Sequence, residues 1–444
     1  MTIFAQSTVP GRSAIAVIRI SGALAGNVVK RLAGGIPPSR RACLRALRHP
    51  KTGEILDRAV VLWFASPASY TGEDVAEFHL HGGRAVVDGV LEVLAAWPGL
   101  RVAEPGEFTR RAFEYGKMDL TEAEGLADLT AAETRSQRRQ ALRQLDGELG
   151  RLYEGWRSTL MRGMALVEAQ IDFPEEGLPE DLTEPAWDNI RGVLQEIRQH
   201  LDDQGRGERL REGLSAVIVG APNVGKSSLL NCLARRDAVI VSDQAGTTRD
   251  VVEVAMDLGG YPVVVADTAG LRRTDDEVEK EGVRRARARA SEADLILAMF
   301  DARNWPETDP ATRDVLPNDG LVVVNKTDLI PGSLGGAPDG RRVWPVSCRT
   351  GAGLDELLGA LTAAAEERLD PGFAPALTRA RHRGALETCA TALDRALEGV
   401  FVGGTAELAG EDLRHAVAAL GRITGRVDVE DLLDVIFREL CIGK

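Results

Sequence analysis

The segment that most restricts the fold of this chain is a glycine-rich loop near its middle. Gly220-Ala-Pro-Asn-Val-Gly225-Lys226-Ser227 directly follows an apolar run, residues 216–219, and leads into a stretch of helical character. Strand, loop and helix in this order are the context that a phosphate-binding loop requires, because its backbone N–H groups surround phosphate oxygens at the start of a helix. The loop therefore predicts an α/β nucleotide-binding domain.

The side chains of this loop have distinct expected roles toward a nucleotide. Lys226 offers a positive charge to the β- and γ-phosphates, and the hydroxyl of Ser227 can ligate Mg²⁺. Asn223 offers an amide oxygen beside the phosphates, where carbonyls of a switch segment can help it hold a monovalent cation in place of an arginine finger. The candidate nucleotide-binding residues here are Asn223, Val224, Gly225, Lys226, Ser227 and Ser228.

Two further polar motifs end predicted strands of the same domain. Asp267-Thr268-Ala269-Gly270 follows residues 263–266, where a carboxylate can hold the magnesium shell and a backbone amide can sense the γ-phosphate. Asn325-Lys326-Thr327-Asp328 follows residues 321–324, and Asp328 can accept hydrogen bonds from the N1–H and 2-amino groups of guanine. Adenine lacks that donor pair, so a carboxylate left unpaired in the site rejects it. The three motifs in this order predict GTP binding.

A loop that closes over the base is expected after the last predicted strand, residues 343–346. Ser347-Cys348 occupies this position, and Arg349 follows directly. We therefore expect Ser347, Cys348 and Arg349 to contribute to the base site.

The segment between the phosphate loop and Asp267 is where the first switch of a GTPase belongs. It contains Gly246-Thr247-Thr248-Arg249-Asp250, and Thr248 is the candidate for the second hydroxyl on Mg²⁺. After Gly270 the chain has Leu271, whereas many GTPases have a glutamine nearby that orients the attacking water. Leucine cannot do this, so hydrolysis must be organised by another group. The local carboxylates able to orient water are Asp275, Asp276, Glu277 and Glu279, and the alternative is a solvated acidic loop.

Composition limits the class of protein. The chain has 444 residues, a formal net charge of −13, 44% hydrophobic and 27% charged residues, which fits a globular protein of two or three domains. No apolar run approaches the ~20 residues of a membrane helix, and the N-terminus lacks a basic start and an apolar stretch, so we expect a cytoplasmic protein without a membrane anchor. Five scattered cysteines without CxxC spacing suggest neither a disulfide framework nor a zinc site.

Periodicity along the chain predicts three kinds of domain. Residues 1–118 mix short strand-like runs, among them 15–20 and 59–64, with turn residues, which indicates an α+β domain. From residue 119 to 212 apolar residues recur at three or four positions, as on one face of a helix, in particular from Leu145 to Ile171. Residues 213–370 alternate strands and helices, and 371–444 are again helical. The expected fold is multidomain: an N-terminal α+β domain, then a discontinuous all-α domain with an α/β P-loop GTPase domain inserted.

Together with segments outside the GTPase domain, these motifs make the whole chain resemble the MnmE (TrmE) family of bacterial tRNA-modification GTPases. The GTPase motifs alone would fit several families, and segments outside that domain make the resemblance specific. These segments are Gly11-Arg-Ser-Ala-Ile-Ala-Val-Ile-Arg-Ile-Ser21, Thr71-Gly-Glu-Asp74, His81-Gly-Gly83, Ala103-Glu-Pro-Gly-Glu-Phe-Thr-Arg-Arg-Ala-Phe113 and the terminal Cys441-Ile-Gly-Lys444.

The resemblance implies a function and a set of partners. It implies a homodimer through the N-terminal domain, which also binds a tetrahydrofolate one-carbon donor, 5,10-methylenetetrahydrofolate, with 5-formyltetrahydrofolate as an analogue. It further implies a potassium-stimulated GTPase whose G domains meet across the dimer, in complex with MnmG, which carries FAD. Together they would install a carboxymethylaminomethyl or aminomethyl group at C5 of the wobble uridine of certain tRNAs.

The resemblance also assigns roles to residues. It implies potassium ligands at Asn223, Ser242, Gln244 and Thr247 within a loop that includes Asp243, Ala245 and Gly246, magnesium ligands at Ser227 and Thr248, and catalytic water organised by Glu279. It implies folate contacts at Arg19, Glu77, Lys117 and Lys444. Two positions depart from the family pattern: Ser242 stands where threonine is common, and the base loop reads Ser-Cys instead of Ser-Ala. Both changes are conservative in the atoms that they offer.

Glu77, His79 and His81 alternate along one predicted strand and should point to one side, where they resemble a metal site. No fourth ligand stands out, and Gly82-Gly83 suggests that the strand ends beside a ligand where a helix begins. We favour a pterin contact for Glu77, because a carboxylate can pair with two adjacent N–H donors.

Cys441 lies fourth from the end, but Ile-Gly-Lys is a poor prenylation signal. It is either a buried structural cysteine or a reactive thiol near the folate, with its pKa lowered by Lys444 or Arg438. We include it, with Asn223, Lys226 and Glu279, among the candidate catalytic residues.

Two arginine clusters can contact tRNA phosphates or belong to a solvated or dimer-facing surface. They are Arg135, Arg138, Arg139 and Arg143 in one predicted helix, and Arg284, Arg285, Arg287 and Arg289 in another.

Three functions remain to be compared. The main hypothesis is a GTP-hydrolysing tRNA-modification enzyme. The second is a ribosome-assembly GTPase switch without group transfer, although residues 375–444 look helical and show no KH-type glycine loop. The third is a folate-binding protein similar to aminomethyltransferases with an acquired G domain.

Overall fold

The computed structural model describes residues 1–172, 180–236, 239–240, 253–267, 289–332, 334–370, 372, 375–401, 406–427, 430–438, 440 and 443 of the chain. The chain divides into two compact units. The first comprises Met1–Ala127, Gln144–Ile190 and Thr391–Lys444, and the second comprises Asp128–Arg143 and Arg191–Ala390. Both units therefore bring together segments that are far apart in the sequence.

The first unit begins with a six-stranded sheet whose strand order is β3-β4-β5-β2-β1-β6. Its strands are β1 (Thr2–Gln6), β2 (Ile15–Ser21), β3 (Cys43–Arg48), β4 (Ile55–Phe64), β5 (Val75–His81) and β6 (Leu100–Val102). Its helices are α1 (Ala25–Ala33), α2 (Arg84–Ala95) and α3 (Glu107–Glu114). All strand pairs are antiparallel except β1 with β6. The strands expected at residues 15–20 and 59–64 are confirmed as parts of β2 and β4.

Alternation along these strands separates two faces of the sheet. Phe4, Ile18 and Phe78 pack into a core with residues of α1 and α2. Ile3 and Ala5, which point the other way along β1, pack with Phe108 of α3 and with Tyr70. On β5, Glu77 and His79 are only half-buried between the buried Ala76, Phe78 and Leu80. The face with Glu77 and His79 is therefore the one on which polar side chains can meet a ligand.

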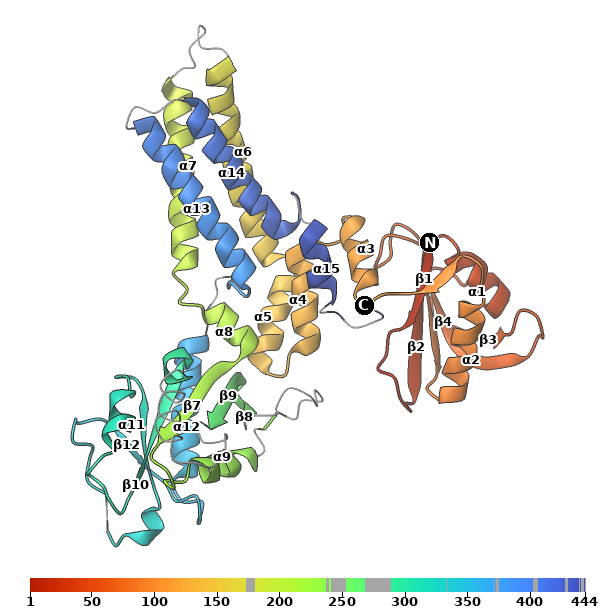
Figure 1. The fold of residues 1–444 in the computed structure, drawn as a ribbon. Coiled ribbons are helices and arrows are strands. Elements are labelled where there is room, and N and C mark those ends of the chain that lie inside the picture. The colour runs from red at the N-terminus through yellow and green to blue at the C-terminus, as the bar shows by residue number, and fades with distance from the viewer. Residues whose placement is uncertain are drawn as a thin grey trace, which may run out of the picture. The chain divides into compact units, whose positions relative to one another are not determined.

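The helical part of the first unit is dominated by two long helices that lie side by side, α6 (Glu148–Asp172) and α14 (Ala406–Thr424) (Figure 1). The other described helices outside the two sheets are α4 (Leu120–Ala131), α5 (Arg135–Leu145), α7 (Glu180–Leu201), α13 (Ala380–Phe401) and α15 (Glu430–Arg438). Of these, α15 lies within the first unit, whereas the other four include residues of both units. Leu149, Leu160 and Val167 are buried, as their helical spacing predicted. Leu145, which we expected on the same helix face, belongs instead to α5.

The reason for this difference is a turn at Asp146-Gly147. Gly147 has φ +79°, a left-handed conformation that an α-helix does not contain and that glycine adopts without steric cost. The apolar period continues across the turn, so periodicity alone does not reveal the break.

The second unit contains a six-stranded sheet of order β12-β11-β10-β7-β9-β8. Its strands are β7 (Leu214–Gly220), β8 (Glu253–Leu258), β9 (Tyr261–Asp267), β10 (Leu295–Asp301), β11 (Leu321–Asn325) and β12 (Val343–Pro345). Its helices are α8 (Arg206–Glu212), α9 (Lys226–Ala234), α11 (Pro310–Asp314) and α12 (Leu354–Leu369), with a 3₁₀ turn η1 (Thr327–Leu329). Among the described strands of this sheet, only the β8–β9 pair is antiparallel. The expected parallel α/β domain is confirmed.

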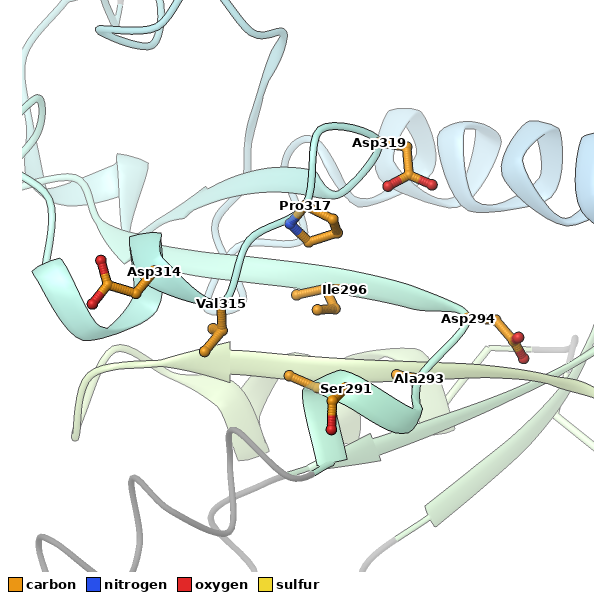
Figure 2. Close-up of a pocket in the computed structure, with 9 residues that line it drawn as sticks. Ser291, Ala293, Asp294, Ile296, Asp314, Val315, Pro317 and Asp319 are labelled. Carbon is orange, nitrogen blue, oxygen red and sulfur yellow. The ribbon is translucent and has the colours of Figure 1, made fainter.

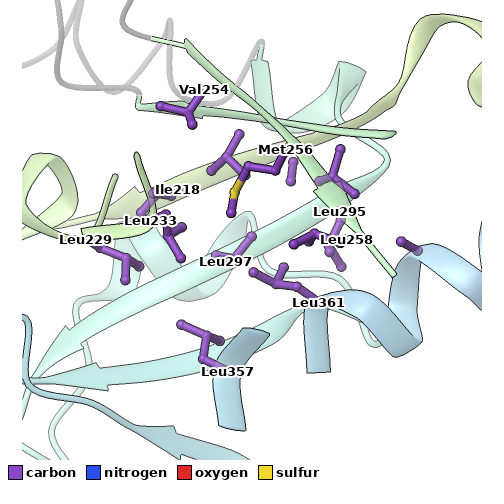
Figure 3. Packing of buried hydrophobic residues seen from close by; sticks show 14 of the residues in the cluster. Ile218, Leu229, Leu233, Val254, Met256, Leu258, Leu295, Leu297, Leu357 and Leu361 are labelled. Carbon is purple, nitrogen blue, oxygen red and sulfur yellow. The ribbon is translucent and has the colours of Figure 1, made fainter. Parts of the chain in front are cut away.

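The core of this domain explains why its strands are nearly continuous apolar runs. Ile218, Met256 and Leu297 of the sheet pack against Leu229 of α9 and Leu357 of α12 (Figure 3). A second apolar cluster, including Val219, Ala298 and Val324, covers the opposite face. Because helices or loops cover both faces, both alternating sets of side chains are apolar.

The parallel strands end at one edge of the sheet, which positions the candidate site. Gly220 ends β7, Asp267 ends β9, Asp301 ends β10 and Asn325 ends β11. Ligands of open α/β sheets bind outside the carboxyl ends of the strands. Within the described parts of the chain, no helix is both long enough and apolar enough to cross a bilayer.

Candidate nucleotide-binding site

The phosphate loop joins β7 to α9 and contains two residues in the left-handed backbone region. Asn223 has φ +62° and Gly225 has φ +108°. A Cβ atom on Gly225 would lie 2.3 Å from Nδ2 of Asn325. Glycine is therefore required at position 225 both by the backbone conformation and by the close approach of the Asn325 side chain.

Lys226 is buried at the start of α9, and its ammonium group lies over the loop. Nζ donates hydrogen bonds to the carbonyl oxygens of Gly220 at 2.7 Å and Ala221 at 3.0 Å. Burial lowers the pKa of Lys226, while Asp267 and Asp309 oppose this effect. These carbonyl contacts hold the positive charge at the phosphate loop, where it is available to a β- or γ-phosphate.

Ser227 and Asp267 meet directly, although they are 40 positions apart. The Ser227 hydroxyl donates a hydrogen bond of 2.5 Å to Oδ2 of Asp267, which is buried at the end of β9. A hydroxyl and a carboxylate are oxygen ligands of the kind that Mg²⁺ prefers, and here they face each other at the end of the phosphate loop. The pair therefore fits a magnesium site in which Ser227 ligates the ion and Asp267 holds its shell.

Asn325 connects the base side of the site to the phosphate loop. Its side chain is buried, Nδ2 donates to the carbonyl oxygen of Val224 at 2.9 Å, and Oδ1 accepts from the backbone N–H of Cys348 at 3.1 Å. One amide group therefore joins three segments that are separate in the sequence, and Asn325 has a structural role within the candidate site.

Lys326 adds a second connection to the same loop. Its backbone is left-handed, with φ +65°, and its Nζ donates to the carbonyl oxygen of Asn223 at 2.7 Å and to Oδ2 of Asp301 at 2.8 Å. Asp301 also accepts two hydrogen bonds from the guanidinium of Arg303. Lys326 therefore joins the base side to the residue that we predict as a cation ligand.

Asp328, the predicted guanine acceptor, is held by the base loop. The Ser347 hydroxyl donates to Oδ1 of Asp328 at 2.7 Å, and the backbone N–H of Thr350 donates to the oxygen of Ser347 at 3.2 Å. Arg349 lies 3.9 Å from Oδ2 of Asp328, and its side chain is exposed. The structure thus brings together Asp328, Ser347 and Arg349, three of the residues that we expected at the base site.

Cys348 is partly buried between the base loop and α9. The Cys232 thiol donates to the carbonyl oxygen of Cys348 at 3.2 Å. Burial, with Cys232 beside it, raises the pKa of Cys348 to about 12. The contribution of Cys348 to the base site therefore comes from its backbone, which bonds to Asn325, and its thiol stays protonated. The described cysteines Cys43, Cys232, Cys348 and Cys389 form no disulfide.

One cavity of this domain lies away from the phosphate loop (Figure 2). It has a volume of about 450 Å³ and is lined by Asp294, Ile296, Asp314, Val315, Pro317 and Asp319, among others. Asp294 precedes β10 and Asp319 precedes β11, so the cavity lies toward the amino ends of these strands. Asp294 accepts from Arg209 and from the backbone of Ser215, and Asp319 pairs with Arg368. It is a surface cavity distinct from the phosphate loop.

The N-terminal sheet carries the second candidate site. Arg19 of β2 and Glu77 of β5 are register partners, and Nε of Arg19 lies 3.0 Å from Oε1 of Glu77. The guanidinium of Arg19 also lies 5.3 Å from the ring centroid of Tyr70 and 5.6 Å from that of Phe108. The structure therefore joins the two predicted folate residues to an aromatic wall that sequence reasoning did not identify.

The C-terminal segment reaches this site through Gly443. Its carbonyl oxygen accepts from Nη1 of Arg19 at 3.2 Å and from the Ser7 hydroxyl at 3.0 Å. Lys117, another predicted folate residue, is exposed in the turn after α3. Among the described residues, no hydrogen bond or ion pair joins Lys117 to Arg19 or Glu77.

Glu77, His79 and His81 share one face of β5, as the alternation predicted. They do not converge on one point, because the two histidines contact different carboxylates. His79 Nε2 lies 3.4 Å from Glu77 Oε2, whereas His81 Nδ1 lies 2.8 Å from Oδ1 of Asp57. In the part of the chain that the structure describes, no group of three metal-binding side chains is positioned to hold a metal ion.

A carboxylate beside an arginine and two aromatic rings fits a flat heterocycle with N–H donors. Glu77 is the acceptor, and its side chain keeps an exposed fraction of 15% although Arg19 and His79 contact it. The residues present are thus compatible with a pterin ring.

Several predicted site residues lie outside the described residues. They are Ser242, Asp243, Gln244, Ala245, Gly246, Thr247, Thr248, Thr268, Ala269, Gly270, Glu279, Cys441 and Lys444, together with Asp275, Asp276, Glu277, Arg284, Arg285 and Arg287. Of the first arginine cluster, Arg135, Arg138 and Arg139 are exposed on α5, while Arg143 donates to the carbonyl oxygen of Gly372 at 3.4 Å.

Three residues of the two candidate sites were not predicted from the sequence: Asp301 in the nucleotide site, and Tyr70 and Phe108 beside Arg19. A signal was present, because Asp301 is a polar residue at the end of a predicted apolar strand, as Asp267 and Asn325 are. Tyr70 and Phe108 gave no comparable signal, since nothing in their local sequence indicates that they approach Arg19.

Comparison with known solved structures finds similarity to GTP-binding domains. A variant of Era from Aquifex aeolicus bound to GDP and AlF₄⁻ is 28% identical and covers 40% of this chain and 66% of that chain, with a TM-score of 0.26. The G domain of the Thermotoga maritima FeoB iron transporter is 20% identical and covers 34% of this chain and 98% of that chain, with a TM-score of 0.23.

Sequence comparisons extend over the whole chain. A family model described as the GTP-binding protein TrmE N-terminus matches residues 2–117, and one described as the MnmE helical domain matches residues 120–441. The tRNA modification GTPase MnmE of Rhodospirillum rubrum is 54% identical over 455 aligned residues, covering 100% of this chain and 99% of the relative. The proteins of the same name from Paramagnetospirillum magneticum and Parvibaculum lavamentivorans are 53% and 54% identical, with coverage of 99–100%. The chain therefore belongs to the MnmE (TrmE) family of tRNA-modification GTPases.

Proposed function

We propose that this chain is a potassium-dependent GTP hydrolase that takes part in modifying the wobble uridine of certain tRNAs. It acts in the cytoplasm as a homodimer through its N-terminal domain, together with the FAD-containing partner MnmG. The pair adds a carboxymethylaminomethyl or aminomethyl group at C5 of the uridine, using 5,10-methylenetetrahydrofolate as the one-carbon donor.

The observation that carries this proposal is the connected pair of phosphate and base loops. Asn325 and Lys326 both bond to carbonyl oxygens of the phosphate loop, and Ser347 holds Asp328. A carboxylate held in this way can accept the two adjacent N–H groups of guanine, whereas adenine would leave it without donors. This favours GTP as the substrate.

The residues around the phosphates support hydrolysis. Lys226 places its charge at the phosphate loop, and Ser227 with Asp267 would hold Mg²⁺, which neutralises charge on the β- and γ-phosphates when bound. We assign potassium binding to Asn223, Ser242, Gln244 and Thr247, and the second magnesium hydroxyl to Thr248. Bound K⁺ supplies positive charge where an arginine finger would act. Glu279 orients the attacking water.

The N-terminal site supports folate binding. Glu77 accepts N–H donors of the pterin ring, Arg19 fixes the carboxylate, and Tyr70 and Phe108 provide an apolar wall. Lys117 and Lys444 contribute the remaining contacts. Cys441 belongs to the same C-terminal segment, and we propose it as the reactive thiol.

Two measurements test the proposal. The GTP turnover rate of the purified chain is measured in potassium and in sodium chloride at equal ionic strength, for the wild type and Asn223→Ala. We expect potassium to accelerate the wild type and to have little effect on the variant. Equal rates in both salts for the wild type would contradict potassium dependence.

The second measurement is the nucleoside content of tRNA after deletion of the gene and after its return. We expect the modified wobble uridine to disappear and to be restored by the wild type, but not by a chain with Glu77→Gln. Unchanged wobble uridines after deletion would favour a GTPase switch without group transfer.

A further inference from the structure

Asp301 lies between the two loops of the nucleotide site, and none of the expected GTPase motifs includes it. It is the last residue of β10, next to β7 and β11 in the sheet, and only 11% of its side chain is exposed. Its position at the carboxyl edge of the sheet puts a carboxylate between the phosphate loop after β7 and the base motif after β11.

Four hydrogen bonds fix the Asp301 carboxylate. Oδ1 accepts from the backbone N–H and from Nε of Arg303, both at 3.0 Å. Oδ2 accepts from Nη2 of Arg303 at 2.6 Å and from Nζ of Lys326 at 2.8 Å. The guanidinium of Arg303 binds both oxygens of the carboxylate in a bidentate pair, which fixes the direction in which Oδ2 faces Lys326.

Lys326 connects the Asp301 carboxylate to the phosphate loop. The same ammonium group that Asp301 holds also donates to the carbonyl oxygen of Asn223 at 2.7 Å. Both Lys326 and Asn223 have left-handed backbones although neither is glycine. Such conformations persist where surrounding contacts determine them, and here the two residues are bonded to each other.

We propose that Asp301 is a positioning residue that couples guanine recognition to the phosphate loop. It fixes the ammonium group of Lys326, and through it the carbonyl group and backbone of Asn223. A guanine bound at Asp328 orders the motif that contains Lys326. Because the Lys326 side chain bonds to the carbonyl oxygen of Asn223, an ordered Lys326 also fixes Asn223. The effect of Asp301 on nucleotide affinity does not require potassium binding, whereas its effect on potassium affinity rests on the proposed function.

The test uses the full chain with Asp301→Asn, which keeps the size of the side chain but removes its charge. Asp339→Asn is the matched control, because Asp339 also accepts from an arginine, Arg341, in an exposed loop of the same domain. The dissociation constant of GDP and the potassium concentration for half-maximal GTP turnover are measured for each. Circular dichroism and thermal melting verify that each variant is folded.

We expect Asp301→Asn to raise the dissociation constant of GDP about tenfold, since a partly buried hydrogen bond between charged groups contributes on that order. The potassium requirement should rise as well, while turnover at saturating GTP and potassium should change little. The control should match the wild type. A dissociation constant of GDP within about twofold of the wild type, in a folded variant, overturns the proposal.

A double-mutant cycle with Lys326→Met separates positioning from general destabilisation. If Asp301 acts through Lys326, adding Asp301→Asn to Lys326→Met should leave the dissociation constant of GDP unchanged. If the two substitutions instead weaken GDP binding by independent factors that multiply in the double variant, the proposal is overturned. If the wild type shows no preference for potassium, the proposed function fails, but the GDP measurements still decide the role of Asp301.

Discussion

The side chain of Asn325 offers the most direct test of how the base site is built. Asn325→Ala removes a donor to the Val224 carbonyl oxygen and an acceptor for the Cys348 N–H. A buried group left without its partner costs about 1–3 kcal/mol. The Val224 carbonyl group belongs to a buried residue, whereas Cys348 is only partly buried and water can replace its partner. The two losses together therefore amount to about 2–4 kcal/mol.

Part of this loss should appear in nucleotide binding, because the released base loop must be ordered again when the nucleotide binds. If about 2 kcal/mol of this loss appears in the binding free energy, the dissociation constant of GDP rises about 30-fold. The assay is equilibrium binding of a fluorescent GDP analogue. Hydrogen exchange of the peptide that covers residues 343–352 should also become faster in the variant.

Two further variants make this test specific. Asn325→Asp keeps the acceptor for Cys348 but turns an anionic oxygen toward the Val224 carbonyl oxygen, so it should bind GDP as weakly as Asn325→Ala. Arg313→Ala changes an exposed side chain of α11 and should bind like the wild type. A change in the GDP dissociation constant below about threefold for Asn325→Ala would refute the reasoning.

Three other perturbations have clear expected outcomes. Ser347→Ala removes the donor to Asp328 and should weaken GTP binding by about fivefold to tenfold, measured by competition with GDP, because a charge-assisted hydrogen bond is lost. Gly225→Ala places a Cβ atom 2.3 Å from Nδ2 of Asn325 in a left-handed backbone and should abolish GDP binding in calorimetry while the far-ultraviolet dichroism is retained. Burial lowers the pKa of His200 to about 4, against an ordinary value of 6.5, while Asp203 opposes this. Because the folded-state pKa is the lower one, stability is present above pH 6.5 and is lost as the pH falls toward 4. A decrease from pH 7 to 5 should cost about 2 kcal/mol, and the melting temperature of His200→Gln should depend less on pH in this range.

Hydrogen bonds within the protein engage the polar side chains of the candidate nucleotide site. Lys226 bonds to carbonyl oxygens of its own loop, Ser227 bonds to Asp267, and Lys326 bonds to Asn223. These three side chains of the candidate site thus have partners within the protein. Binding exchanges these contacts for new ones, so the affinity depends on the difference between the two sets.

The sequence by itself determined the fold class and the position of the phosphate and base motifs within the domain. The strands from 216–219 to 343–346 were predictable because a sheet covered on both faces requires apolar residues at consecutive positions. The motifs at Lys226, Asp267 and Asp328 were predictable because the chemistry of phosphate, magnesium and guanine restricts both residue type and spacing. The family resemblance came from short segments of this kind distributed over the whole chain.

Only the tertiary structure decided which side chains meet across distant segments. The position of Lys326 between Asp301 and Asn223 and the approach of Gly443 to Arg19 join residues that no local pattern relates. The physical reason is that sheet order and loop conformation set these distances, whereas periodicity reports only which face of its own element a residue occupies. For the same reason the break at Gly147 was missed, since the apolar period continues through it.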